Sequence, residues 1–491
     1  MKRRNFFEKS LALGGGLAAT SMLSGFTAGV NTTDSKEPPG IASEQNFDVI
    51  VVGGGTGGVL AAIAAARTGA KTALVEMKGY TGGIVTEGGT TLHSFFNLWK
   101  AFPGVEKRQV IKGIPQEIIY RLAKVGGTPG HCEMTLNYGY DSVATCVDTE
   151  LYKMVTMQML QEAGVHIALN TMMCGVVKQR AKLTGIITES HGGREIMNAK
   201  VFIDASGYGD LCGHAGAKWS NLNDHNVCNS MAIANVDMDR YYSFLVDHDA
   251  VNDIAYGSYD GYHNQIVRLG ARSQRLPVEF MSELRQAQTG ADLSMTTTVH
   301  KNYFVFIKCN YKLPTGPLSR DEVTQAEIAI RGNMHRSLEI FRKHIPGFER
   351  AFISRTAPSL AIRRGRCIEC DYDLSNEEIV NATHFDDEVY VYGFHDQAPR
   401  PEFQIKNGGT YGYPYRASCV KGFDNLYAIG MMVTSEFSAH MSTRNTVSCM
   451  AMGQAFGTAA AMCAARNIGI RALPYTDLKA QLVKDDVYFE K

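Results

Sequence analysis

The clearest hydrophobic pattern in the chain lies between residues 46 and 83. The run at 49–52 is apolar and β-branched at every position, as in a strand that is buried on both faces of a parallel sheet. A glycine-rich turn follows, and the small and aliphatic residues at 59–66 predict a closely packed helix. A second mostly apolar run at 71–75 predicts another strand. The pattern therefore predicts strand, turn, helix and strand in that order.

The turn in this unit has the G-x-G-x-x-G spacing at Gly53, Gly55 and Gly58. The first glycine permits the bend, the second lets backbone approach a diphosphate, and the third lets helix and strand pack closely. The diphosphate binds unpaired N–H groups at the positive end of the helix. Glu76 ends the second strand, 18 residues beyond Gly58 (76 − 58), where a carboxylate can bind a ribose hydroxyl. This order predicts a dinucleotide site, and the acid favours FAD or NAD over NADP.

The middle of the chain continues with helix and strand patterns. Residues 113–126 predict an amphipathic helix, Asp148 caps another helix that Gly164 ends, and residues 165–200 predict strands joined by tight turns. The run at 201–210 predicts a buried strand that enters a glycine-rich turn and returns to the first sheet.

Two long helices are predicted in the second half. Ser319 and Glu322 have the spacing of a capping box at the start of a helix that reaches His344. Residues 424–430 predict a strand that ends in Gly430, and residues 450–466 predict a helix rich in alanine and glycine. Small residues at this density indicate close packing against backbone or a flat ring.

Composition sets the limits of the fold and of the partners. With 491 residues, 45% of them hydrophobic, the chain can bury a large core, and its length indicates two or three domains. Lys and Arg total 49, as do Asp and Glu, so the formal charge is zero. There is no basic field to attract nucleic acid, and we expect no nucleic-acid partner. No metal-ligand pattern appears, and we predict no metal site.

The N-terminus resembles a twin-arginine export signal. Arg3 and Arg4 precede Phe6 and a weakly apolar, glycine-rich run at 11–30, which is a poor membrane span. An ordinary secretory signal or an uncleaved anchor is the alternative. We predict an export signal at 1–30, a linker at 31–45, a periplasmic or otherwise exported protein, and no transmembrane span in the mature chain.

The chain has eleven cysteines, an odd number without the spacing of a small disulfide framework. Only Cys367 and Cys370 have the C-x-x-C spacing of a redox dithiol. They lie in a stretch that is more typical of a strand or turn than of a helix start. A redox dithiol and an inert pair both stay open.

Four blocks of the sequence together resemble the large FAD-dependent oxidoreductase family built like the glutathione-reductase and fumarate-reductase flavoproteins. They are VVGGGTGGVLAAIAAARTGAKTALVE with TGG behind it, FIDASGYGDL, the helix and arginine-rich block at 321–372, and the block from YRASCVKGFDNLYAIGMM to SAHMSTRNTVSCMAMGQAFGTAAAM. The resemblance implies an α/β fold, in which a Rossmann-like FAD-binding domain with a parallel sheet is interrupted by a mixed α+β substrate domain.

The resemblance also implies domain limits and FAD contacts. The FAD-binding domain comprises 46–95, 140–218 and 412–470, the substrate or cap region comprises 96–139 and 219–411, and 471–491 form a tail. The residues expected to contact FAD are Gly53, Gly55, Gly58, Glu76, Gly82, Gly83, Met173 (through its backbone, at adenine), Ser206, Gly207, Gly430 and Arg444.

Catalytic candidates lie near the expected ring end of this site. They are His395, which precedes Asp396, together with His440, Arg416 and Arg444. An arginine there can stabilise negative charge on a reduced flavin, and a histidine can move a substrate proton. The alternative is that the histidine is an ordinary loop residue and that the arginines form ion pairs between domains. The aromatic group at 93–99 lines either a ring pocket or a domain junction.

The sequence departs from the family pattern at Arg364 and Gly365, and in RNTVSC, which lacks an expected proline. No second G-x-G-x-x-G follows a strand, so NAD(P)H is not the expected partner. We predict an exported FAD-dependent oxidoreductase that transfers hydride or electrons between a small organic substrate and a non-nicotinamide carrier, such as a quinone or a periplasmic carrier. The alternatives are a thiol–disulfide flavoenzyme that uses Cys367 and Cys370, or a non-catalytic flavin electron-relay subunit. The oligomeric state is not predicted.

Overall fold

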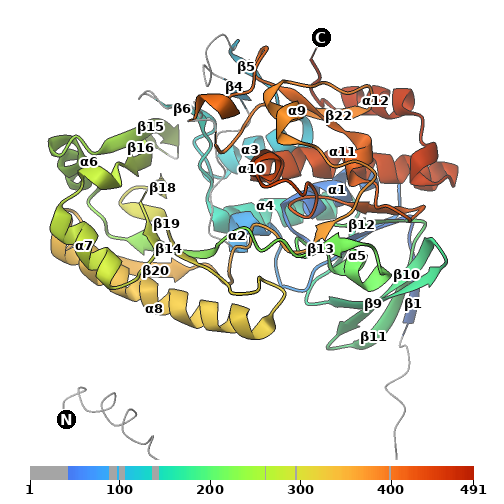
Figure 1. The fold of residues 1–491 in the computed structure, drawn as a ribbon, viewed down its shortest axis with the longest axis horizontal. Helices are drawn as coiled ribbons and strands as arrows, with labels where there is room; N and C mark the ends of the chain where they lie inside the picture. Colours follow the sequence, from blue (N-terminus) through green and yellow to red (C-terminus); the bar gives the residue numbers. More distant parts are fainter. Residues whose placement is uncertain are drawn as a thin grey trace, which may run out of the picture. The chain divides into compact units, whose positions relative to one another are not determined.

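The computed structural model describes residues 43–87, 97–98, 106–134, 143–259, 261–293, 296–397 and 400–490 (Figure 1). The predicted export signal, most of the predicted linker and the aromatic residues His93, Phe95, Phe96 and Trp99 lie outside these ranges.

A five-stranded parallel sheet forms the centre of the FAD-type region, the segments 46–95, 140–218 and 412–470 that are predicted to bind FAD. Its strands run in the order β24 (Leu426–Ala428), β12 (Val201–Asp204), β2 (Val49–Val52), β3 (Thr72–Val75) and β8 (His166–Ala168). Because β2 has parallel neighbours on both sides, Val52 lies beside both Val75 and Asp204. The chain segments that follow these three strands therefore meet at one edge of the sheet, where ligands bind in open parallel sheets.

Two helices of small residues pack together beside this sheet. Helix α1 (Thr56–Arg67) follows β2, and helix α11 (Thr446–Arg466) comes from the far end of the chain (Figure 1). A Cβ atom at Gly453 would lie 2.2 Å from the carbonyl oxygen of Gly57, so the two backbones nearly touch. Helix α11 begins at Thr446, four residues before the predicted start at 450, and Asn445 is its N-cap.

A second, four-stranded sheet extends this region. It contains β1 (Ser43–Asn46), β11 (Gly193–Asn198), β10 (Lys182–Ser190) and β9 (Met172–Gln179) in that order. Strand β1 pairs in parallel with β11, so residues 43–45 belong to a sheet although the sequence pattern placed them in a linker. Their polar side chains point alternately to solvent, which is why composition alone gave no strand signal.

The cap region has its own antiparallel sheet and its own apolar core. The strands run in the order β15 (Val251–Tyr259), β16 (Tyr262–Ala271), β18 (Thr296–His300), β19 (Tyr303–Tyr311), β14 (Val227–Ala234) and β20 (Phe352–Thr356), with β17 (Ala291–Asp292) paired to β19. Helices α6 (Met238–Asp247) and α8 (Arg320–His344) pack against this sheet, and α7 (Val278–Gln286) packs against α8.

Helix α8 begins as predicted at the N-cap Ser319, whose side chain accepts from the Glu322 N–H. The predicted capping box is only half formed. The Glu322 carboxylate accepts from the backbone N–H and the hydroxyl of Thr315 instead of the Ser319 backbone. The preceding loop folds back on the helix and provides the closer donors.

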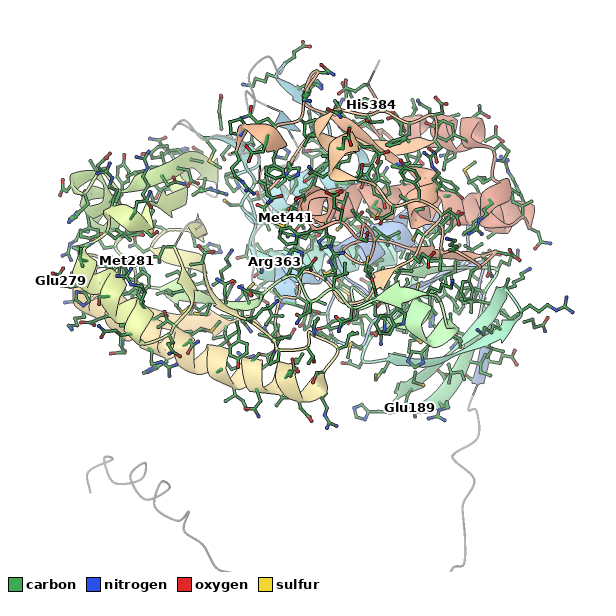
Figure 2. All side chains as sticks on the ribbon, viewed as in Figure 1. Glu189, Glu279, Met281, Arg363, His384 and Met441 are labelled. Carbon is green, nitrogen blue, oxygen red and sulfur yellow. The ribbon has the colours of Figure 1, made fainter. Side chains whose placement is uncertain are left out.

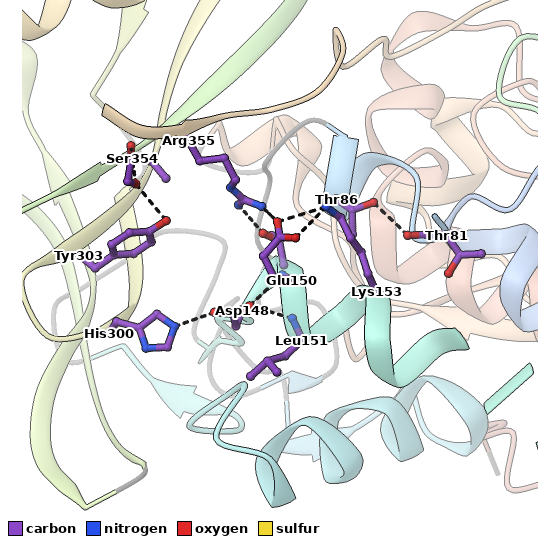
Figure 3. Close-up of polar contacts among 12 residues, drawn as sticks. Thr81, Thr86, Asp148, Glu150, Leu151, Lys153, His300, Tyr303, Ser354 and Arg355 are labelled. Carbon is purple, nitrogen blue, oxygen red and sulfur yellow. Dashed lines mark hydrogen bonds and ion pairs between the residues drawn. The ribbon is translucent and has the colours of Figure 1, made fainter. Parts of the chain in front are cut away.

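The cap contacts the FAD-type region at the start of helix α4 (Thr149–Glu162). His300 Nε2 lies 2.6 Å from the carboxylate of Asp148, the N-cap of α4, and Arg355 pairs with Glu150 (Figure 3). Burial opposes the charge of Asp148, but the bonds from His300 and from the Leu151 N–H outweigh it, and the pKa of Asp148 is lowered.

Shorter elements complete the described ranges. They are α2 (Ile84–Glu87), β4 (Asn97–Leu98), β5 (Arg108–Gln109), α3 (Gly113–Lys124), β6 (Cys132–Glu133), β7 (Val143–Ala144), α5 (Asp210–Ala215), β13 (Trp219–Ser220), β21 (Cys367–Ile368), α9 (Asn376–Val380), β22 (Glu388–Tyr392), β23 (Tyr411–Pro414), α10 (Phe437–Thr443), α12 (Tyr475–Lys484) and four 3-10 turns. One helix in these ranges, α11, is long and apolar enough to span a membrane, and the 18-residue window of it that meets this test is buried inside the protein.

Candidate functional site

A cavity of about 490 Å³ runs from the edge of the parallel sheet to the cap region. At the sheet end it is lined by the α1 N-terminus and by the segments that follow β3 and β12. At the cap end its lining includes Cys228, Lys308, Arg363, Asp396 and Arg444. The described residues of both regions therefore enclose one continuous space.

The N-terminus of helix α1 provides an anion-binding end to this cavity. Its N-cap is Gly55, which has no side chain to cap the first N–H groups of the helix. A Cβ at Gly58 would lie 1.9 Å from the Gly53 oxygen, and one at Gly83 would lie 2.7 Å from the Gly55 Cα. Side chains at these glycines would push the turn apart, so the glycines keep helix, strand and the segment at 82–83 together. Unpaired N–H groups at such a helix end favour a phosphate.

Glu76 lies beside this turn, immediately after strand β3. Its carboxylate accepts from the Gly54 N–H at 2.6 Å and from the Lys78 N–H at 2.8 Å. The side chain lines the cavity, and burial raises the pKa of Glu76 while these two N–H groups lower it. The lone pairs that remain on the carboxylate can accept hydrogen bonds from ribose hydroxyls.

The turn after β12 is held by a buried acid that the sequence analysis did not single out. Asp204 accepts from the Ser206 N–H at 3.0 Å, the Ser206 hydroxyl at 2.7 Å and the Cys212 N–H at 2.8 Å. Burial raises the pKa of Asp204, although the hydrogen bonds from these donors act to lower it. Because Asp204 fixes this turn, Ser206 and Gly207 keep their place in the cavity wall. Only the position of an acid at the end of an apolar strand could have indicated this role.

The predicted cofactor residues divide into two groups. Eight of them line the cavity, namely Gly55, Glu76, Gly83, Met173, Ser206, Gly207, Gly430 and Arg444. The other three, Gly53, Gly58 and Gly82, lie behind the wall and shape it. The Gly53 N–H donates to the Val75 oxygen and the Gly82 N–H donates to the Gly54 oxygen.

The catalytic candidates are separated by the fold. Arg444 lines the cap end of the cavity and pairs with Asp396 at 2.9 Å. His395 does not line the cavity. Its Nε2 contacts the Asn376 amide oxygen at 2.8 Å, and burial lowers the pKa of His395 to about 4. Its neighbour Asp396 pairs with Arg444, and the charge of Asp396 raises the pKa of His395 by less than burial lowers it.

His440 is also buried behind the wall. Its Nδ1 lies 3.0 Å from His225 Nε2, and its Nε2 lies 3.0 Å from the carbonyl oxygen of Met431, a cavity residue. Arg416 lies elsewhere, paired with Asp387 and stacked on Tyr372. Of the predicted catalytic group, only Arg444 reaches the cavity.

Cys367 and Cys370 lie outside this cavity and line a separate one of about 560 Å³. Cys367 belongs to the short strand β21, as the sequence pattern indicated. Burial raises the pKa of both thiols, which disfavours the thiolate that redox exchange requires. Across the described ranges, no group of three or more His, Cys, Asp or Glu side chains is placed to hold a metal ion.

A comparison with protein families decides the assignment. The family model described as FAD dependent oxidoreductase matches residues 48–482. The chain belongs to the FAD-dependent oxidoreductase family. This FAD-dependent oxidoreductase has the expected fold, an α/β architecture with a Rossmann-like parallel sheet and a mixed cap, and its cofactor is FAD.

Similarity to individual proteins is low. No curated protein matches the chain. One similar structure is a geranylgeranyl bacteriochlorophyll reductase-like protein from Thermoplasma acidophilum, 14% identical, covering 90% of this chain and 84% of that one with a TM-score of 0.46. A myxobacterial chondrochloren halogenase is 13% identical, covering 89% and 78%, with a TM-score of 0.43. The p-nitrophenol 4-monooxygenase from Pseudomonas putida is 10% identical, covering 89% and 84%, with a TM-score of 0.42.

The residues of the cavity fit FAD. The uncapped helix end suits the diphosphate, and the buried Glu76 suits the ribose. Bound FAD supplies hydride and electron transfer at its ring system. The chain's own task is to bind and orient that ring and to place a substrate against it.

Proposed function

We propose that this FAD-dependent oxidoreductase transfers hydride or electrons between a small organic substrate and a carrier other than NAD(P)H. The observation that carries the proposal is the single cavity that joins the diphosphate end of the FAD site to a cap end lined by charged side chains. A substrate entering the cap end meets the cofactor without crossing a further wall.

The charged pair at the cap end has a defined part in this proposal. Arg444 is held by Asp396 at 2.9 Å, and its Nε makes no hydrogen bond within the described ranges. A buried guanidinium with a free N–H can stabilise negative charge that develops on a reduced cofactor or on a substrate oxygen. Asp396 keeps the guanidinium in place.

The choice of carrier rests on the sequence. It has one G-x-G-x-x-G after a strand and no second one, so a nicotinamide domain of the disulfide-reductase type is missing from the pattern. The N-terminal pattern of paired arginines supports export, which brings the protein to quinones and periplasmic carriers. Twin-arginine export moves folded proteins, and this suits a chain that acquires FAD before it leaves the cytoplasm.

Anaerobic redox titration tests the carrier. The protein with bound FAD is photoreduced, and its reoxidation by a soluble quinone is followed at the flavin absorbance beside reoxidation by NAD⁺ and NADP⁺. We expect the quinone to reoxidise it and the nicotinamides to leave it reduced. Rapid stoichiometric bleaching of the oxidised protein by NADH or NADPH would reject the proposed carrier.

A further inference from the structure

Almost every charge that lines the cavity has an opposite charge within 4 Å. The pairs are Lys78–Glu87 at 2.6 Å, Asp210–Arg366 at 2.8 Å, Lys308–Asp292 at 2.8 Å and Arg444–Asp396 at 2.9 Å. Among the described residues, Glu76 and Arg363 are the two lining charges without such a partner. Glu76 is explained by the FAD ribose. Arg363 has no carboxylate within 4 Å among the described residues.

The backbone places Arg363 firmly at the cap end of the cavity. Two residues earlier, the Ala361 N–H donates to the Cys228 oxygen at 2.7 Å, and the Cys228 N–H donates back at 3.1 Å. Figure 2 shows Arg363 near the middle of the molecule, where the cap meets the FAD-type region. Its Nη1 donates to the Asn226 oxygen at 2.8 Å. A guanidinium has five N–H donors, and this is its one hydrogen bond within the described ranges.

The surroundings of Arg363 are positive. Three further cations, Arg364, Arg444 and Lys312, lie with Arg363 near His225. Burial lowers the pKa of His225 most, and the four cations lower it further, to about 2. His225 is therefore neutral and adds no charge. Within 4 Å of the four cations, the carboxylates among the described residues are Asp224, on Arg364, and Asp396, on Arg444. The local sum is two positive charges (4 − 2).

Arg363 is half-buried in the cavity wall, and a cleft lined by charges of one sign attracts ions of the opposite sign. A guanidinium with free, forked donors matches a carboxylate in geometry and charge. We propose that the substrate carries a carboxylate and that Arg363 binds it at the cap end of the cavity. This inference rests on the proposed function, because it assumes that the substrate enters the cap end beside the flavin.

A different occupant would be the FAD diphosphate itself. In that case the removal of Arg363 would weaken FAD, not the substrate. Measuring both affinities in the same variants separates the two possibilities.

The test uses the full chain with bound FAD. Acetate, succinate, benzoate and the neutral isostere benzamide are titrated while the flavin absorbance is recorded. The variants are Arg363→Gln, Arg363→Lys and the control Lys312→Gln, which removes a nearby cation outside the cavity lining. Circular dichroism and FAD content show that each variant is folded.

We expect at least one carboxylate to perturb the wild-type flavin spectrum saturably, and benzamide not to do so. Arg363→Gln should weaken that Kd at least about tenfold, Arg363→Lys less, and Lys312→Gln by less than about threefold. The Kd for FAD should stay within about threefold in all variants.

The proposal is overturned if no carboxylate binds, if benzamide binds equally well, if Arg363→Gln binds the carboxylate unchanged, or if it loses FAD instead. If the protein holds FAD but fails these titrations, only the proposed carboxylate site is refuted. If it binds the carboxylate but quinone does not reoxidise it, only the proposed carrier is refuted.

Discussion

The substitution Gly58→Ala tests whether the glycine turn is as tight as the structure requires. The new Cβ would lie 1.9 Å from the Gly53 carbonyl oxygen and 3.0 Å from the Ala205 Cβ. Real Cβ contacts stay beyond 3.0 Å, so the helix start and strand β2 must separate by about 1.1 Å (3.0 − 1.9). The obstacle is backbone, which cannot rotate away as a side chain can.

The expected change in the free energy of unfolding of Gly58→Ala follows from two opposing effects. Forcing an extra carbon into a packed site costs about 1–3 kcal/mol, and a backbone obstacle places this case at the upper end. Alanine gains about 1 kcal/mol over glycine in a helix. We expect a net loss of about 2 kcal/mol in the free energy of unfolding. FAD affinity should fall at least about tenfold, because the N–H groups of the turn lose their alignment.

A matched control is Gly332→Ala. Gly332 also lies inside a helix, α8, but its Cβ would have only the end of the Arg336 side chain at 3.5 Å. This variant should gain stability, up to about 1 kcal/mol, and bind FAD normally. Urea unfolding followed by circular dichroism, and titration of the apoprotein with FAD, measure both quantities. A Gly58→Ala protein as stable as wild type, with unchanged FAD affinity, would refute the reasoning.

Three further predictions concern charges and thiols. Glu76→Gln keeps only one of the two hydrogen bonds from the Gly54 and Lys78 N–H groups, because the amide NH2 cannot accept, and it removes the charge that faces the ribose. The Kd for FAD should therefore rise at least about tenfold in an equilibrium titration, and an unchanged Kd would place the ribose elsewhere. The lowered pKa of Asp148 contributes stability above its ordinary value of 3.8, and this stability is lost as the pH falls through the folded-state value. Melting temperatures should therefore fall more steeply between pH 7 and pH 3 for the wild type than for Asp148→Asn. The variant lacks the charged contact with His300 at every pH, so its stability has less to lose. Parallel curves of melting temperature against pH would contradict this. The double variant Cys367→Ser/Cys370→Ser should keep its rate of flavin reoxidation within about twofold, whereas loss of activity would support a thiol–disulfide enzyme.

The FAD half of the site could be predicted from the sequence because its chemistry is local. The spacing of Gly53, Gly55 and Gly58, followed by Glu76, lies within one strand–turn–helix–strand unit, so the order of residues sets their geometry. Strands β2, β3 and β12 could be predicted from their short apolar runs, whereas the place of β8 in the same sheet could not.

The substrate half depends on contacts between distant segments, and the sequence pattern misjudged it. The order of His395 and Asp396 predicts a histidine tuned by its neighbour, but Asp396 pairs with Arg444, 48 residues later, and His395 is buried beside Asn376. No sequence pattern indicates Arg363, because its lack of a partner among the described residues depends on where charges from distant segments lie. Strand β1 was missed because its residues are polar.

The most direct test of the central claim is the absorbance spectrum of the purified protein, repeated on the supernatant after heat denaturation. If the cavity binds FAD as described, the spectrum shows a flavin band, and the supernatant yields intact FAD at close to one molecule per chain. A folded protein that shows no flavin band, even after incubation with added FAD, would contradict the account.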